Sequence, residues 1–146
     1  MVLNDGRKLV AKTVLVSSKY DFRFLRIQPP YPLKPLAWAD SATARVGQDI
    51  MMIAHKDNQH SLRVGKINRL VSHEFLGVNL ALNHGDSGSP ILDSQGRLLG
   101  IVAAQEKSRQ HAGLAIASNT IRERYLRWKR GGFKSNSALQ ERHTGL

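Results

Sequence analysis

The stretch Asn83-His84-Gly85-Asp86-Ser87-Gly88-Ser89-Pro90 is the part of this 146-residue sequence that points most directly to a fold. Apolar, strand-like runs flank it at residues 78–82 and 98–104. A tight glycine-rich turn between strands can expose a serine hydroxyl and direct neighbouring backbone N–H groups at one point, as an oxyanion hole requires. The stretch therefore marks Ser87 as a candidate nucleophile and the N–H groups of Gly85 and Ser87 as candidate oxyanion donors.

The same stretch resembles the nucleophile loop of chymotrypsin-like serine proteases, whose signature reads Gly-Asp-Ser-Gly-Gly-Pro. Ser89 stands where that family has its second glycine, and because serine is small we expect the turn to be kept. The resemblance implies that Ser87 belongs to a Ser-His-Asp triad, in which a base takes the serine proton and an acid orients that base. It implies a structural role for Asp86.

A second motif, Tyr20-Asp21-Phe22-Arg23-Phe24-Leu25-Arg26-Ile27, resembles Thr-Asp-Leu-Ala-Leu-Leu-Lys-Ile of the bacterial HtrA/Deg branch of that family. Asp21 then takes the place of the triad aspartate, 66 residues before Ser87. Three further segments match that branch in the same order: 46–50, 64–67 and 113–119. The resemblance extends from residue 2 to residue 128.

The triad histidine is the missing part of this pattern. In the resembled family it precedes the aspartate, but only twenty residues precede Asp21 here and none is histidine. The resemblance therefore implies a first β-barrel without its opening strands. We expect either a fragment or truncated product of a protease gene, or a degenerate homologue.

His84 is the one histidine that the sequence ties to the nucleophile loop, three residues before Ser87. It is a candidate substitute base, although Asp21 would not then orient it. The other histidines are expected to be exposed: His55 and His60 in a polar loop, His73 after a strand, His111 in a turn and His143 in the tail. No histidine pair with a carboxylate shows metal-ligand spacing, so the sequence predicts no metal site and no cofactor.

A specificity pocket follows from the resemblance alone. It places Ala81 at the base of the pocket and His84 at its mouth, with walls from residues 101–104 and 113–116, including Ala103 and Ala104. These residues are small or apolar, and no acid stands at the base. The resemblance therefore implies a preference for small aliphatic side chains.

Composition excludes several classes of protein. There is no cysteine, so no disulfide framework stabilises the fold, and no apolar run reaches the ~18 residues of a membrane span.

The net charge is +11, and residues 119–146 supply +5 of it from seven bases and two acids. This balance favours acidic partners or a solvated basic face, and without a recognised motif it disfavours nucleic acid. Residues 1–4 do not form a signal peptide; we expect a periplasmic or secreted protein if a signal segment has been lost, and a cytoplasmic one otherwise.

The local patterns predict an all-β protein with one C-terminal helix. Short strands recur every 8–12 residues, with hairpin turns at residues 5–6 and 93–96. Thr120 and Glu123 form a capping box for a helix over residues 120–130. We expect a protease domain over residues 1–132, followed by a basic polar tail over 133–146. The domain is expected to consist of a partial first barrel (1–36), a second barrel (46–117) and the helix (120–130).

The sequence thus predicts a chymotrypsin-like double β-barrel with an incomplete first barrel. The function that follows is a serine endopeptidase that hydrolyses peptide bonds, with the triad histidine missing from this chain. The alternative is an inactive protease homologue that binds peptides or proteins, and a third class is a basic domain for nucleic acid or an anionic surface. Unpaired edges of the first barrel predict self-association.

Overall fold

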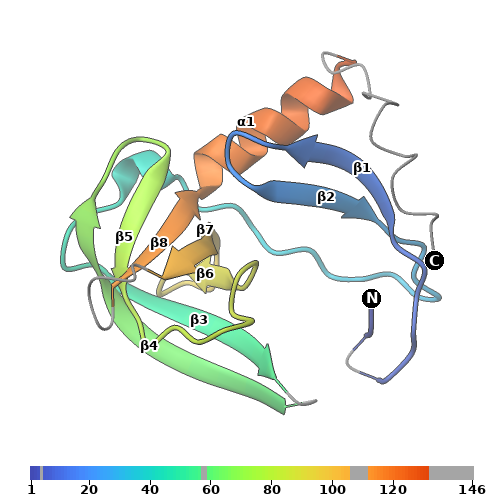
Figure 1. The fold of residues 1–146 in the computed structure, drawn as a ribbon, viewed down its shortest axis with the longest axis horizontal. Coiled ribbons are helices and arrows are strands. Elements are labelled where there is room, and N and C mark those ends of the chain that lie inside the picture. The colour runs from blue at the N-terminus through green and yellow to red at the C-terminus, as the bar shows by residue number, and fades with distance from the viewer. Residues whose placement is uncertain (4, 57–58, 106–111, 132–146) are drawn as a thin grey trace, which may run out of the picture.

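The computed structural model describes residues 1–3, 5–56, 59–105 and 112–131 (Figure 1). Strands are the main regular secondary structure of these residues, as predicted for an all-β protein. The elements are β1 (Lys12–Ser17), β2 (Phe22–Arg26), a 3-10 turn (Ser41–Thr43), β3 (Asp49–Lys56), β4 (Gln59–Leu70), β5 (Phe75–Asn79), β6 (Pro90–Leu92), β7 (Leu98–Gln105), β8 (Gly113–Ala117) and α1 (Ser118–Lys129).

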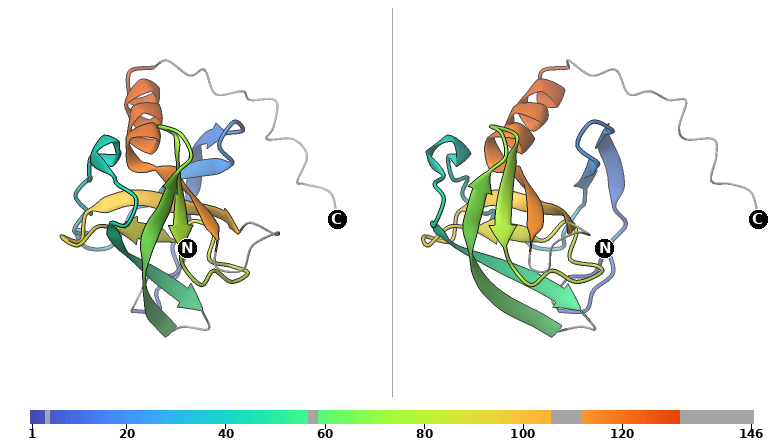
Figure 2. Two further views of the ribbon diagram at one scale, coloured as in Figure 1. Left: turned by 90° about the vertical axis from the view of Figure 1, so that its left-hand side faces the viewer. Right: turned by 60° about the vertical axis from the view of Figure 1, so that its left-hand side comes forward.

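Strands β3 to β8 close into an antiparallel barrel in the order β3-β4-β5-β8-β7-β6 (Figure 2). The alternation along β3 shows why the barrel closes: Ile50, Met52 and Ala54 are buried, whereas Ile53 faces solvent. Burying apolar side chains on the inner face of the strands drives this closure, and closure leaves no free edge where the six strands pair around the barrel. The core is built from residues of all six strands and their loops: Ile50, Met52, Ala54, Ile67, Leu76, Val78, Leu80, Leu82, Ile91, Leu99, Val102, Ala115 and Ala117.

The first barrel is represented by the two-stranded antiparallel sheet β1-β2. In the described ranges neither strand has a second neighbour, which is the incomplete barrel that the sequence predicts. Its aromatic side chains hold it to the rest of the molecule. Tyr20 is buried in a cluster with Ile116 and Ile121, and Phe22 and Phe24 pack against that cluster.

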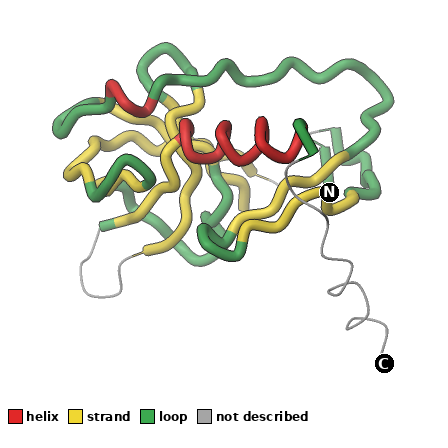
Figure 3. The backbone as a smooth tube through the Cα atoms, turned by 90° about the horizontal axis from the view of Figure 1, so that it is seen from above, coloured by secondary structure: helices red, strands yellow, loops and turns green. Residues whose placement is uncertain are grey.

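A long connector joins the two sheets and runs past α1 (Figure 3). The proline-rich segment 29–35 contains no strand, as expected from a residue type that cannot donate to a ladder. At its end the connector attaches to β7, where the Ala39 N–H donates to the Leu98 carbonyl at 2.9 Å and the Leu98 N–H donates to the Ala37 carbonyl at 2.7 Å.

The predicted capping box at Thr120 is wrong. Helix α1 begins two residues earlier, its N-cap is Ala117, and no side chain caps it in that position. Tertiary contacts replace the local cap, because the Asn119 N–H donates to Ser41 Oγ at 3.1 Å and Ser118 Oγ donates to the Ala39 carbonyl at 2.8 Å. Thr120 is instead buried inside the first turn.

The helix ends as predicted, at a glycine. Gly131 has φ +80°, and its N–H donates to the Trp128 carbonyl at 2.9 Å. The predicted turns also form, with Gly6 at φ +83° and Gly96 at φ +74°. Among the described residues no helix has the length and apolar character needed to cross a bilayer.

Candidate active site

Ser87 lies exposed in the loop between β5 and β6. The loop turns sharply because two glycines adopt left-handed backbone angles, Gly85 with φ +94° and Gly88 with φ +89°. Two backbone bonds close it: the Asp86 N–H donates to the Asn83 carbonyl at 3.1 Å, and the Ser89 N–H donates to the Asp86 carbonyl at 3.0 Å. A Cβ at either glycine would meet open space, so the backbone angle and not crowding requires glycine there.

Backbone hydrogen bonds fix the far side of the loop to β7. The Gly88 N–H donates to the Val102 carbonyl at 2.8 Å, and the Val102 N–H donates to the Ser89 carbonyl at 3.0 Å. Ser87 Oγ lies 3.4 Å from the Ala103 carbonyl oxygen, a long and weak contact for a hydroxyl donor. The Ser87 hydroxyl is therefore held above a barrel strand without being locked in a strong bond.

Asp86 holds the loop to strand β4. It is 5% exposed, and its carboxylate forms an ion pair with Arg63 of β4 and accepts the Asn83 N–H at 2.6 Å. Arg63 Nη1 also donates to the Ala81 carbonyl at 2.7 Å. The Arg63 guanidinium therefore contacts two points of the segment that leads to Ser87, the Ala81 carbonyl and the Asp86 carboxylate.

Sequence reasoning did not single out Arg63. On β4 the usual alternation of buried apolar and exposed polar side chains is reversed. Leu62 and Val64 are exposed, whereas Arg63 pairs across the ladder with the buried Met52. The signal that could have found it is the acid before Ser87. A buried carboxylate needs a cation, and an arginine on the inward face of a nearby strand can supply one.

Asp21 occupies the turn between β1 and β2 and is exposed. Its φ is +53°, which among the described residues makes it the only non-glycine with a left-handed backbone. Aspartate tolerates this conformation, and such backbone strain is concentrated at functional sites. Its neighbour Tyr20 holds the turn in place, since the Tyr20 hydroxyl donates to Glu74 Oε1 at 2.5 Å. No contact within the described ranges joins Asp21 to Ser87, so a triad role for Asp21 stays a prediction.

The residues assigned to a specificity pocket are only partly gathered. Ala81 and His84 are exposed, and Ala103 is half-buried beside the Ser87 hydroxyl. The side chain of Ala104 lies outside the described part of the chain. The pocket roles of these residues remain predictions.

The expectation for two histidines needs correction. His55 and His60 do not lie in a loop, because each is in a strand, His55 in β3 and His60 in β4. The ladder extends further than the polar composition of this segment indicates, since β3 pairs with β4 as far as Lys56 and Gln59. His73 is exposed as expected, and His111 and His143 lie outside the described residues. The part of the chain that is described contains no group of three or more metal-ligating side chains.

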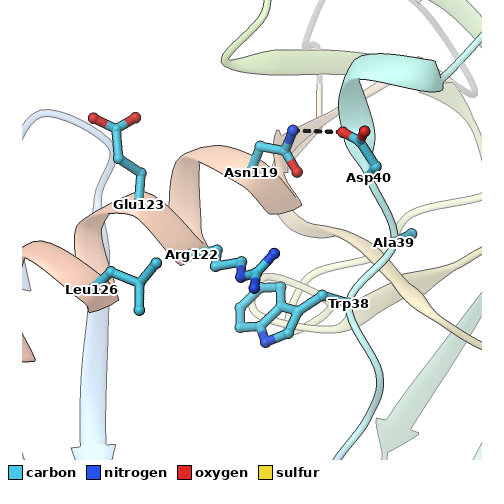
Figure 4. Close-up of a pocket in the computed structure, with 7 residues that line it drawn as sticks. All are labelled: Trp38, Ala39, Asp40, Asn119, Arg122, Glu123 and Leu126. Atoms are coloured by element: carbon cyan, nitrogen blue, oxygen red, sulfur yellow. Dashed lines mark hydrogen bonds between the residues drawn. The ribbon is translucent and has the colours of Figure 1, made fainter.

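An open pocket of about 430 Å³ lies away from Ser87, between the connector and α1 (Figure 4). The close-up shows the Arg122 guanidinium beside the Trp38 indole, with Leu126 at one side. At the other side Asn119 Nδ2 donates to Asp40 Oδ1 at 2.7 Å. This bond, followed by the bond from the Ala42 N–H, lowers the pKa of Asp40.

The chain matches the trypsin-like peptidase domain family over residues 1–101. It is 30% identical over 135 residues to the periplasmic pH-dependent serine endoprotease DegQ of Escherichia coli K12, a match that covers 82% of this chain and 29% of DegQ. It is 28% identical over 137 residues to the serine protease Do-like HtrA of Bacillus subtilis, covering 82% of this chain and 30% of that protein. The chain therefore spans less than a third of the length of these relatives.

A solved structure agrees with these relatives. The HtrA-type protease AlgW, determined with a decapeptide, superposes with a TM-score of 0.78 at 26% identity, covering 90% of this chain and 44% of that one. The similarity includes the barrel and helix described above, so the chymotrypsin-like fold predicted from the sequence is confirmed. Sequence and fold agree: the chain belongs to the trypsin-like peptidase family, in its HtrA/Deg-like branch.

Proposed function

We propose that this chain is the nucleophile-bearing part of a serine endopeptidase. The observation that carries the proposal is the Ser87 loop, in which an exposed serine follows a buried, ion-paired aspartate between two left-handed glycines. This arrangement holds a serine at the surface on a rigid support, which nucleophilic catalysis requires. Relatives that match most of this chain are serine endoproteases by name, which favours the same chemistry here.

The reaction assigns a role to each residue. Ser87 Oγ attacks the carbonyl carbon of the scissile peptide, and a histidine supplied from outside this chain takes the hydroxyl proton and returns it to the leaving amine. Asp21 orients that histidine and stabilises its charged form. The N–H groups of Gly85 and Ser87 donate to the oxyanion that develops on the attacked carbonyl.

The substrate proposed is a peptide with a small aliphatic side chain before the cleaved bond. Ala81, Ala103 and Ala104 support this choice, since each is small and none is charged. That AlgW was solved with a decapeptide agrees with a peptide ligand for this fold.

Peptide turnover tests the proposal. The 146-residue polypeptide alone is expected to hydrolyse peptides very weakly, with at most the residual ~10³–10⁴-fold acceleration that a triad lacking a member retains. Adding an N-terminal segment with its strands and histidine, taken from a relative such as DegQ, is expected to restore turnover. Ser87→Ala in the extended protein is expected to abolish it, and turnover that survives this substitution would refute the nucleophile assignment.

An inactive homologue that binds peptides is the alternative, and the same experiment separates the two. In that case the extended protein binds the peptide but neither cleaves it nor reacts at Ser87. Robust turnover by the unextended chain would point to another base. His84→Ala is then the first variant to make, because His84 is three residues from the nucleophile.

A further inference from the structure

The end of the β3-β4 hairpin carries a histidine pair that no part of the proposed protease chemistry uses. His55 and His60 stand directly opposite each other in the antiparallel ladder. Their rings lie 4.7 Å apart, centroid to centroid, with an angle of 57° between the ring planes. Both residues are exposed.

The spacing of the two rings fits one metal ion between them. An imidazole nitrogen binds zinc at about 2.0–2.1 Å, which puts the ion about 3.2 Å from the ring centroid. Two such ligands at an angle of about 90–110° place their centroids about 4.5–5.3 Å apart, given that bond length. The observed 4.7 Å falls inside this range, and the tilt of 57° is far from the parallel planes of a stacked pair.

We propose that His55 and His60 form a two-imidazole site for a divalent transition-metal ion, Cu²⁺ or Zn²⁺. Neutral imidazole nitrogen suits these ions, whereas Mg²⁺ and Ca²⁺ require oxygen ligands. Among the described residues no third metal-ligating side chain stands with the pair, so the proposal rests on two imidazole ligands. The pair shares no residue with the loop that carries Ser87.

The position of the pair gives the ion a structural effect. Strand β3 pairs with β6 only at Met51 and Met52, and β4 pairs with β5 only from Lys66 onward. Beyond these points the hairpin continues as two strands that pair only with each other in the described part of the chain, and Figure 1 shows it extending from the barrel. An ion held by His55 and His60 joins these strands near the free end of the hairpin. Because the ion binds only when the two strands are paired, it stabilises the paired hairpin by mass action.

Titration of the 146-residue chain with Cu²⁺ and then with Zn²⁺, followed by calorimetry, tests this site. One ion per chain is expected, and His55→Ala or His60→Ala is expected to weaken binding at least about tenfold, since each removes a ligand held at high effective concentration. His73→Ala is the matched control, because His73 is an exposed histidine that belongs to no such pair in the described ranges. Binding unchanged in His55→Ala and His60→Ala, or weakened as much in His73→Ala, would overturn the site.

Two further readouts separate this site from a folding defect. The electron paramagnetic resonance spectrum of bound Cu²⁺ should show two equivalent nitrogen ligands in the native chain and one in either single variant. Zn²⁺ should slow amide hydrogen exchange at residues 53–55 and 60–62 in the native chain but not in the variants. A native spectrum with a single nitrogen, or exchange unaffected by Zn²⁺ at saturation, contradicts the proposal.

Discussion

Arg63 forms an ion pair with Asp86, the residue that precedes the candidate nucleophile, and the same guanidinium donates to the Ala81 carbonyl. The Arg63 and Asp86 side chains are 19% and 7% exposed. A charge buried to this degree is stable only while its partner is present. The loop that presents Ser87 therefore depends on a residue in a different strand, β4.

Replacing Arg63 with methionine leaves the buried carboxylate of Asp86 without its cation. We expect the free energy of unfolding to fall by about 3 kcal/mol, the lower end of the range seen when one partner of a buried pair is removed. Urea unfolding measures this. Lys66→Met on the same strand is the control, because Lys66 pairs with Asp49 at 2.5 Å between side chains that are 58% and 77% exposed. That exposed pair should contribute less than about 1 kcal/mol, and equal losses in the two variants would contradict the anchoring role of Arg63.

The triad role of Asp21 predicts a specific kinetic defect in the chain extended by a histidine segment. Asp21→Asn is expected to lower kcat by about 10⁴-fold with little change in KM, because the amide no longer holds the imidazole in the reactive tautomer. Steady-state hydrolysis of a peptide measures both constants. Asp49→Asn, at an exposed carboxylate on β3, is the control and should leave kcat unchanged. A kcat equal to that of the parent in Asp21→Asn rules out the triad role.

The attachment of the first sheet to the barrel is expected to weaken in acid. The Tyr20 hydroxyl, and then Lys19 at 2.9 Å, lower the pKa of the Glu74 carboxyl from its ordinary value of 4.5. A lowered pKa in the folded state adds stability above pH 4.5 that is lost as the pH falls through the lower value. Unfolding free energies measured between pH 7 and pH 3 should therefore fall more steeply for the parent than for Tyr20→Phe, which lacks the donor. Parallel pH curves for the two proteins would show that this bond does not hold the sheet.

The docking of helix α1 predicts a cost for removing one hydroxyl. Ser118 is fully buried, and its Oγ donates to the Ala39 carbonyl at 2.8 Å. Ser118→Ala leaves that carbonyl without its donor, so we expect a loss of about 1–2 kcal/mol in unfolding free energy. Ser94→Ala, at an exposed turn position, should change stability by less than about 0.5 kcal/mol. A loss for Ser118→Ala as small as that of Ser94→Ala would exclude the helix-docking role.

Local chemistry made much of this molecule predictable from its sequence. The turn around Ser87, strand β7 after it and the stop at Gly131 follow from glycine, proline and apolar patterns, and the structure contains each of them. The strand before the turn ends earlier than predicted, since β5 stops at Asn79 and residues 80–82 lie in the loop. These features depend on residues that are neighbours in the chain. Because local backbone preferences produce these features, they can be predicted without knowing which distant residues are in contact.

Two of the features that sequence reasoning missed depend on contacts between residues far apart in the chain. Helix α1 takes its first hydrogen bonds from Ser41 and Ala39, 78 and 79 residues away, which no capping rule can anticipate. The cation for Asp86 comes from Arg63, 23 residues earlier on another strand. The pairing of His55 with His60 required the exact register of β3 on β4, and a one-residue slip would have separated the rings.

Covalent labelling gives the most direct test that Ser87 is the nucleophile. The chain extended by a histidine segment is treated with a fluorophosphonate, which reacts with activated serines, and the modified residue is located by peptide mass mapping. We expect one adduct on Ser87, absent from Ser87→Ala and retained in Ser89→Ala, whose serine lies in the same loop. An adduct on Ser89, an adduct that persists in Ser87→Ala, or a folded extended protein without any adduct would contradict the assignment.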